Sequence, residues 1–316
     1  MMADTNQVEA PPSVLHLLNQ SNRRLERLLQ NLRNERNAES ELRDIARDVI
    51  QAVEINPDIA LACIFLCQIA GSYAVRHCIE TAVVVVVLSR SLDKSPADTL
   101  TVTAAALTMN VGMLRHNEVF QNKNTPLSSE EMAIVRRHPE ESADMLKCAG
   151  IEDAEWISCV LLHHENDEGS GYPAGIASPE VTLNAKLLSL ADRYCAQVSA
   201  RNYRRSILPN LALRNLIDDK AAPADPTLIE HFQRELGDFP PGSLVRLQNG
   251  EIGVVSRRVG DCLQVHCLRT PSGAALSPAE LRRTGDESCA ITEALSEDQA
   301  SIRFSMKQIW GLQASL

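Results

Sequence analysis

Helix patterns dominate the middle of this chain and constrain its fold more than any other feature. Residues 54–220 form a succession of helical segments, several of which begin with a clear N-cap signal. Asn56 and Ser95 are each followed by proline, and Ser128 with Glu131 has the spacing of a capping box. Aromatic residues make up only 3% of the chain, so the core must be built from Leu, Val, Ile and Ala, which favours helices over an all-β architecture. We therefore predict a mostly α protein.

The apolar spacing indicates where the individual helices lie. We expect them at Ile59–Ala70, Val75–Leu88, Pro96–Met109, from Ser128 to His138, at Asp153–His164 and at Asn184–Ser199. The second of these contains a run of valines, and β-branched residues lose rotamer freedom in a helix. A strand is the competing interpretation there, and only tertiary burial would make the segment helical.

A polar tail of residues 1–12 and a helical pattern rich in Arg and Glu precede this region. In the helical pattern, leucines recur at heptad a and d positions, with Asn22 at the remaining a position: Leu15, Leu18, Leu25, Leu29 and Leu32. Fewer than three heptads are present. Two interpretations stay open: the helix packs on its own domain, or residues 15–32 form a homodimer.

The composition changes at residues 239–242, where two prolines and a glycine follow Phe239. Beyond them, residues 244–247 and 252–256 flank an Asn-Gly turn and are typical of a β-hairpin. Cys262–Leu268 is expected as a third strand, and a short helix is expected around Glu297–Trp310. We predict three parts: residues 1–53 as an N-terminal tail and helical segment, 54–238 as a helical bundle, and 239–316 as a small β-rich domain.

Charge and cysteine usage limit the partners and the compartment. The formal net charge of −10 argues against non-specific binding to nucleic acid or anionic lipid, so we expect no DNA and no membrane partner. Residues 1–12 lack the apolar region of a signal peptide, and the longest apolar run, Ile59–Cys67, is too short to cross a bilayer. The nine cysteines are scattered and mostly lie in apolar stretches, which is typical of reduced cytoplasmic proteins. Cys63 and Cys67 have the spacing of a metal or redox pair, but also that of one turn in an apolar helix.

Two adjacent histidines are the strongest functional signal. An apolar segment, Ile157–Leu162, precedes His163, His164 and Glu165, and the chain then continues as Gly169-Ser170-Gly171-Tyr172-Pro173. The glycines allow the loop backbone to approach a ligand closely. This stretch resembles the HHExxDGxGYP signature of the HD-GYP family, whose members hydrolyse the bacterial messenger cyclic di-GMP at a metal centre. The resemblance implies an HD-domain-like helical bundle.

Further motifs keep the order and approximate spacing of that family over residues 70–210. By resemblance, the metal ligands are a set of histidines and one aspartate: His77, His138, His163, His164 and Asp192. The same resemblance implies that the Gly171-Tyr172 loop contacts the nucleotide and that Arg201 and Arg204 bind its phosphates. A solvated pair at a helix end is the alternative for the two arginines. Several motifs in register identify the family far better than one histidine pair would.

The name-giving His-Asp pair of the family is missing. Met109, Asn110 and Met113 stand where the family has His, Asp and Lys. A thioether is a poor ligand for Fe, Mn or Mg, and a neutral amide cannot replace a carboxylate that bridges two cations. Glu168, Cys195 and Tyr73 also depart from the family pattern. We therefore expect either one divalent ion, Fe, Mn or Mg, held by His138, His163 and His164, or no metal.

The retained motifs and the missing His-Asp pair together leave three possible functions. The first is a catalytically impaired signalling module that still binds cyclic di-GMP or regulates a protein partner. The second is an active or weakly active metal-dependent cyclic di-GMP phosphodiesterase with a remodelled site. The third is a structural module in which the site residues only fill the core.

Overall fold

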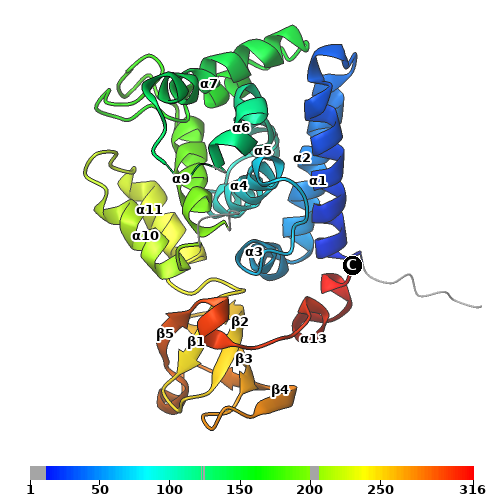
Figure 1. Cartoon of the computed structure of the whole chain (residues 1–316), viewed down its shortest axis with the longest axis vertical. Coiled ribbons are helices and arrows are strands. Elements are labelled where there is room, and N and C mark those ends of the chain that lie inside the picture. The colour runs from blue at the N-terminus through cyan, green and yellow to red at the C-terminus, as the bar shows by residue number, and fades with distance from the viewer. Residues whose placement is uncertain (1–11, 122, 124, 200–205) are drawn as a thin grey trace, which may run out of the picture.

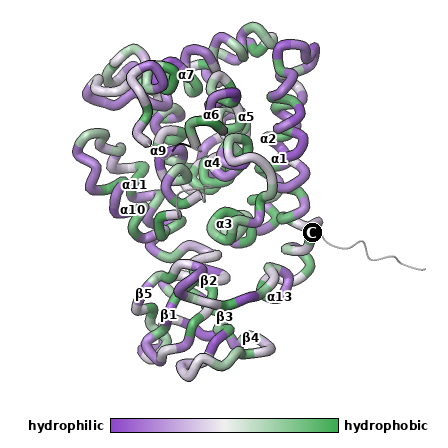
Figure 2. Tube along the Cα trace, viewed as in Figure 1, coloured by the Kyte–Doolittle hydropathy of each residue, from purple (hydrophilic) through white to green (hydrophobic). Residues whose placement is uncertain are grey.

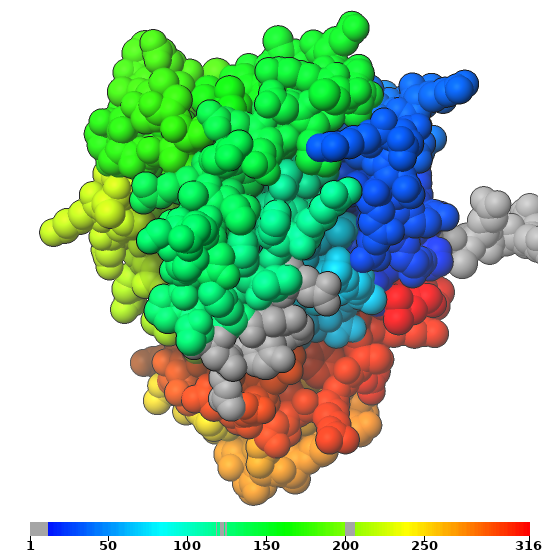
Figure 3. All heavy atoms as spheres, turned by 45° about the horizontal axis from the view of Figure 1, so that its top comes forward, coloured from blue at the N-terminus to red at the C-terminus, as the bar shows by residue number. Residues whose placement is uncertain are grey.

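The computed structural model describes residues 12–121, 123, 125–199 and 206–316. Helices form a large body, and a small sheet lies below it in the view of Figure 1. The end of the chain returns to its beginning, because the Ser13 hydroxyl donates to the carbonyl oxygens of Gln313 and Ser315. Figure 3 shows these last residues, in red, against the blue start of the first helix.

The helical body is built from eleven α-helices in the described part of the chain, and two short ones follow the sheet. Their bounds are α1 Val14–Gln30, α2 Ala38–Ile55, α3 Pro57–Phe65, α4 Tyr73–Ser91, α5 Pro96–Thr108, α6 Leu114–Gln121, α7 Ser129–Cys148, α8 Ala154–Leu162, α9 Leu183–Val198, α10 Pro209–Asp218, α11 Pro226–Glu235, α12 Glu297–Ala300 and α13 Met306–Trp310. The predicted caps are confirmed: the side chains of Asn56 and Ser95 accept backbone N–H groups, and Ser128 with Glu131 forms a capping box. The sequence pattern did not predict α6, α10 or α11.

The valine run is helical. Val83, Val84, Val85 and Val86 are fully buried in the middle of α4, so a strand at this position is excluded. Figure 2 shows hydrophobic residues gathered around α3 and α4 in the middle of the helical body. Burial on all sides outweighs the rotamer entropy that a helix costs these side chains.

The leucines of α1 pack inside their own chain. Leu15, Leu18, Leu25, Leu29 and Leu32 are all buried in the main core. Asn22 is also buried, and its amide donates to the carbonyl of Ala70 at 2.6 Å. Asn19 accepts the N–H of Ala70 at 2.9 Å and donates to the carbonyl of Gln68. The apolar seam that would join two copies through residues 15–32 is thus occupied by the chain itself, which favours the first of the two interpretations.

The C-terminal part is a five-stranded antiparallel sheet with the order β4-β3-β2-β1-β5. The strands are β1 Leu244–Leu247, β2 Ile252–Val259, β3 Cys262–Arg269, β4 Ala275–Arg283 and β5 Ile291–Leu295. The first three were predicted, whereas β4 and β5 were missed. The single helix expected around Glu297–Trp310 is two short helices, α12 and α13, because residues 301–305 between them are not helical.

The sheet is joined to the helical body by close packing. A Cβ on Gly242 would lie 2.8 Å from the Cα of Ala62 in α3, so only glycine fits there. The main core cluster includes side chains from each of the three predicted parts. Within the described residues, no helix combines the length and the apolar character that a membrane span requires.

Candidate metal centre

The central histidines come from the interior of one helix and the C-terminal end of another. His138 lies inside α7, His163 is the C-cap of α8, and His164 follows it. The Asp153 side chain caps the start of α8 by accepting the N–H of Trp156 at 3.0 Å. The buried Trp156 indole donates to Thr108 Oγ1 at 2.8 Å, which ties α8 to the end of α5. Both contacts hold the N-terminal part of α8 and tie it to α5, and the helix carries the two adjacent imidazoles at its other end.

Hydrogen bonds to the backbone orient two of the rings. His138 Nδ1 lies 2.6 Å from the carbonyl of Val135, and His163 Nδ1 lies 2.7 Å from that of Val160. A carbonyl only accepts, so both Nδ1 atoms must carry the hydrogen. The Nε2 atoms are then unprotonated in the neutral rings, and they face each other at 3.3 Å. Two lone pairs directed at one another repel, and a cation between them would relieve this repulsion.

His164 completes the cluster. One ligand atom from each of His138, His163 and His164 lies within 4.8 Å of the other two. The ring of Tyr172 stacks on that of His164, with centroids 4.7 Å apart. His138 and His163 are buried, while His164 is half-buried, so the cluster is reached from the side of His164 and Tyr172.

His77 and Asp192 pair with each other instead. His77 in α4 and Asp192 in α9 are both buried, and His77 Nε2 lies 2.7 Å from Asp192 Oδ1. Because an ionised carboxylate only accepts, His77 donates from Nε2. Its Nδ1 is buried without a hydrogen-bond partner among the described residues. The ring of Tyr73 stacks on the His77 imidazole, with centroids 5.5 Å apart.

Burial sets the protonation of these groups. It lowers the pKa of His138 to about 4, with the neighbouring His163 as a second cause. Burial also lowers the pKa of His163 and, more strongly, that of His164. For Asp192, burial opposes ionisation, but the hydrogen bond from His77 and the nearby imidazoles hold its pKa below the ordinary range. Near neutral pH the cluster therefore offers three neutral nitrogen ligands and the pair holds a carboxylate.

The loop after the histidine pair is fixed by its own chemistry. A Cβ on Gly171 would lie 2.4 Å from the carbonyl oxygen of His164 and 2.5 Å from the Cα of Glu165, so glycine is required for this close approach. Glu165 Oε1 accepts the N–H groups of Ala174 at 2.7 Å and of Gly175 at 3.0 Å. The sequence did not predict this role of Glu165, although a carboxylate just before a glycine-rich loop is the signal that could have indicated it.

The substituted residues lie at the end of α5. Met109 is its C-cap and is fully buried, Asn110 is buried, and Met113 ends the short 3-10 helix that follows. In that turn, the N–H of Gly112 donates to Ser142 Oγ at 2.9 Å. Ser142 lies one helical turn after His138 in α7. The turn that follows Met109 and Asn110 is thus packed against the helix that carries His138.

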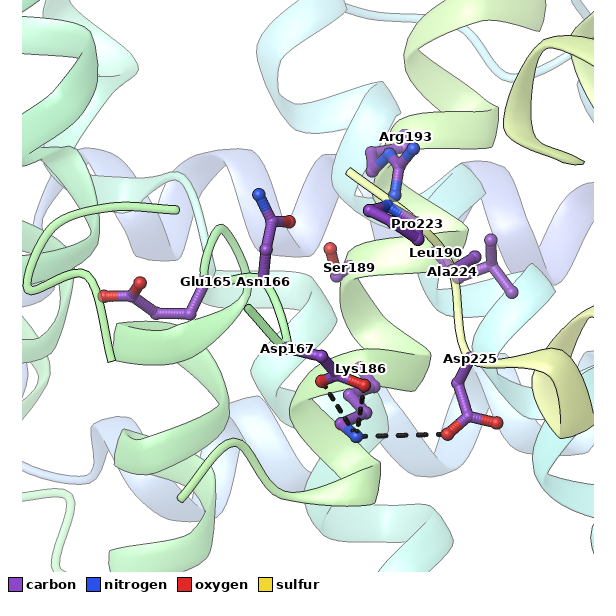
Figure 4. Close-up of a pocket in the computed structure, with 10 residues that line it drawn as sticks. All are labelled: Glu165, Asn166, Asp167, Lys186, Ser189, Leu190, Arg193, Pro223, Ala224 and Asp225. Carbon is purple, nitrogen blue, oxygen red and sulfur yellow. Dashed lines mark hydrogen bonds and ion pairs between the residues drawn. The ribbon is translucent and has the colours of Figure 1, made fainter. Parts of the chain in front are cut away.

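A narrow pocket borders the site on the side of α9 (Figure 4). Lys186 extends between two carboxylates, 2.9 Å from Asp167 and 3.9 Å from Asp225, and Arg193 forms an ion pair with Asp219 at 2.7 Å. These contacts tie the stretch after the histidine pair to α9 and to the loop before α11. Sequence reasoning missed this support, because its partners are far apart along the chain.

The other predicted site residues are placed as follows. Glu168 is exposed and accepts a hydrogen bond from Ser170, and Cys195 is buried in α9. Arg201 and Arg204 lie outside the described residues. Of the five predicted metal ligands, the structure groups three and separates two as a hydrogen-bonded pair.

The kinds of ligand atom in the cluster show which arrangement of metal ions it fits. The three imidazoles fit one divalent ion, because their ligand atoms converge within 4.8 Å of one another. The cluster contains no carboxylate among the described residues, and Asn110 carries no charge. A carboxylate-bridged pair of ions therefore does not fit this arrangement.

Comparisons with known proteins agree with these motifs. The family model described as HD domain matches residues 65–228, which is more than half of the chain. A cyclic di-GMP phosphodiesterase of Pseudomonas aeruginosa is 28% identical over 220 residues, which are 70% of this chain and 53% of that protein. The cyclic di-GMP phosphodiesterase PdeB of Borreliella burgdorferi is 22% identical over 188 residues, which are 60% of this chain and 49% of that one. The chain thus spans about half the length of these curated relatives.

A solved structure shares the fold. An HDG"Y"P protein from Bdellovibrio bacteriovorus superposes with a TM-score of 0.58 at 18% sequence identity, and the match covers 73% of this chain and 74% of that one. At this identity the likeness concerns the fold alone. The mostly helical HD-domain fold with a small C-terminal antiparallel sheet is therefore established.

Proposed function

This chain belongs to the HD domain family, and on this premise we propose that it is a cyclic di-GMP signalling module with impaired hydrolysis. Its named relatives are cyclic di-GMP phosphodiesterases, which supports the ligand. The observation that carries the proposal is the composition of the site. Three imidazoles converge at one point, whereas Asn110, which the resemblance aligns with the bridging carboxylate of the family, is neutral.

The chain's own residues would divide the work of such a module. His138, His163 and His164 would hold one divalent ion, which when bound lowers the pKa of a bound water and offsets phosphate charge. Tyr172 and Gly171 keep the loop against His164, on the accessible side of the cluster. We propose that this loop, with Arg201 and Arg204, holds the nucleotide. Without a second bridged ion, the charge that develops during phosphodiester cleavage is poorly stabilised. The chain would therefore still bind the nucleotide but hydrolyse it slowly or not at all.

Calorimetric titration of the full chain with cyclic di-GMP tests this proposal. We expect saturable binding of the nucleotide. An Arg201→Ala, Arg204→Ala double variant should weaken it at least about tenfold, because two phosphate contacts are lost. Arg214→Ala is the matched control, since this exposed arginine of α10 belongs to no predicted site. Absence of any heat of binding or shift in melting temperature with cyclic di-GMP would refute the ligand.

A weakly active phosphodiesterase is the second candidate. The convergence of three imidazoles favours it, because one ion held there can activate a water. Release of the linear dinucleotide by the wild-type chain, lost in His163→Ala, would select this candidate over the first.

The remaining parts of the chain carry smaller proposals. We propose that residues 1–53, 54–238 and 239–316 are distinct domains, that the protein acts in the cytoplasm, and that a protein partner reads its ligand state. The sheet of residues 244–295 lies outside the family match and is the part available for such a partner.

A further inference from the structure

The geometry around His138 and His163 contains information on the kind of ion. Both rings present Nε2, because both Nδ1 atoms donate to carbonyls in their own helices. These hydrogen bonds to the backbone thus leave Nε2 as the ligating atom of both rings, with or without a metal. Rings held in this way resist the reorientation that a different coordination geometry would need.

The separation of the two Nε2 atoms suits tetrahedral coordination. Nitrogen ligands at about 2.05 Å from Zn²⁺ and at the tetrahedral angle lie about 3.3–3.4 Å apart. Ligands at about 2.1 Å in the octahedron that Mg²⁺ demands lie about 3.0 Å apart. In this structure the two Nε2 atoms lie 3.3 Å apart, which is compatible with the tetrahedral arrangement.

Among the described residues, no carboxylate joins the three imidazoles of the cluster, although Glu165 Oε2 is buried without a hydrogen-bond partner. Asp192 Oδ1 accepts from His77 at 2.7 Å, and Glu165 Oε1 accepts two backbone N–H groups. Hard ions such as Mg²⁺ and Mn²⁺ prefer oxygen ligands, whereas imidazole nitrogens suit Zn²⁺ and other late first-row ions. A site of three imidazoles therefore discriminates against the hard ions.

We propose that His138, His163 and His164 form a mononuclear site for a late first-row ion, with Zn²⁺ as its representative, and that Asp192 stays outside the ligand set. This inference rests on the proposed function and deepens it, because it disfavours the Mn and Mg expected from the resemblance and keeps the ions that imidazole nitrogen suits. The fourth position, on the side of Tyr172, stays open to water or to a phosphate oxygen.

Metal titration of chelator-treated full-length protein, without nucleotide, tests the proposal. We expect one Zn²⁺ per chain and an affinity at least about 100-fold above that for Mn²⁺ or Mg²⁺. Substitution with Co²⁺ should give the intense visible absorption of a four-coordinate ion, without the near-ultraviolet band of thiolate ligation. X-ray absorption of the zinc-loaded wild type should show nitrogen and oxygen neighbours only. These readouts need no variant and no enzymatic activity.

Matched variants separate the ligands from their neighbours. His138→Ala and His163→Ala should each lower zinc affinity at least about 100-fold, while Asp192→Asn should change it less than about threefold. Two ions per chain, a preference for Mn²⁺, a six-coordinate or thiolate-ligated Co²⁺ spectrum, or loss of zinc in Asp192→Asn would overturn the inference. Binding of cyclic di-GMP is measured separately, so a protein that binds the nucleotide but takes two manganese ions refutes only the metal assignment.

Discussion

Tyr172 and His164 form one unit: their rings stack with centroids 4.7 Å apart, and the N–H of Tyr172 donates to the carbonyl of His164 at 3.1 Å. The loop that is proposed to meet the nucleotide is therefore attached to an imidazole of the candidate metal centre. Movement of one must displace the other, so ligand and ion binding should be coupled.

Glu165 should be the main anchor of this loop. Glu165→Ala removes the acceptor for the N–H groups of Ala174 and Gly175, and we expect a loss of about 2–3 kcal/mol in the free energy of unfolding. Glu165→Gln keeps a carbonyl oxygen and should cost about 1 kcal/mol. Chemical denaturation and hydrogen exchange at residues 174 and 175 check both values. Glu168→Ala, at an exposed neighbouring carboxylate, is the control, and unchanged exchange in Glu165→Ala would contradict this role.

Gly171 should tolerate no side chain. The atoms that a Cβ would meet are backbone atoms of His164, Glu165 and Asn166, all within 2.7 Å, so the neighbours cannot yield by a rotamer change. We expect Gly171→Ala to lower the free energy of unfolding by about 1–3 kcal/mol or to displace the loop. Ser170→Ala is the adjacent control. A variant with wild-type stability and an unchanged spectrum of the bound Co²⁺ would show that the loop does not pack as described.

Local signals predicted the helical body well. Asn56, Ser95 and Ser128 mark helix starts through hydrogen bonds to residues two or three positions away, which a sequence displays directly. By contrast, β4 contains Pro278 and has mostly exposed side chains, so it lacks the apolar alternation of a strand. The strand β5 has only five residues, and its register depends on β1 rather than on its own pattern.

The residues of the candidate site were predicted from the sequence, but most of the contacts between them were not. The pairing of His77 with Asp192 joins residues 115 positions apart, so no spacing in the sequence indicates it. The same holds for the contact of Gly112 with Ser142. The resemblance gave five candidate ligands, and His138, His163 and His164 were expected to hold a single ion. The structure groups these three, and it pairs the other two, His77 and Asp192, with each other.

Asn22 should stabilise the fold of the single chain, and replacing it should leave the oligomeric state unchanged. Its amide donates to the carbonyl of Ala70 from a fully buried position, so Asn22→Leu leaves that carbonyl unpaired. We expect a loss of about 1–3 kcal/mol in the free energy of unfolding, and no change in molar mass by light scattering. If α1 instead formed a dimer interface, the leucine would strengthen association. A larger molar mass for Asn22→Leu than for the wild type would favour that alternative.

Asp58 should make stability depend on pH between about 4 and 6. Burial at the junction of α3 with β2 raises its pKa to about 6, and Arg257 and Arg258 offset this only in part. The folded state therefore holds the proton more tightly than the unfolded state. This contribution to stability is full below about pH 4 and is lost as the pH rises through about 6. Asp58→Asn should thus gain melting temperature relative to wild type on going from pH 4 to pH 7, and a difference that is constant with pH would contradict the shift.

Restoring the missing His-Asp pair should raise metal affinity and add a second ion. Met109→His with Asn110→Asp returns an imidazole and a carboxylate to the end of α5, and we expect higher metal affinity and more than one ion per chain. Elemental analysis of the double variant, the single Asn110→Asp variant and the parent checks this. If the double variant holds no more metal than the parent, the assignment of Met109 and Asn110 to the family's His-Asp positions is wrong.

Chromatography of the products after incubation of metal-loaded wild-type protein with cyclic di-GMP tests the impaired-hydrolase account most directly. The account predicts that the nucleotide is bound and recovered intact by the wild type, while the Met109→His, Asn110→Asp variant releases linear product. Steady release of linear product by the wild type, abolished in His163→Ala, would contradict it.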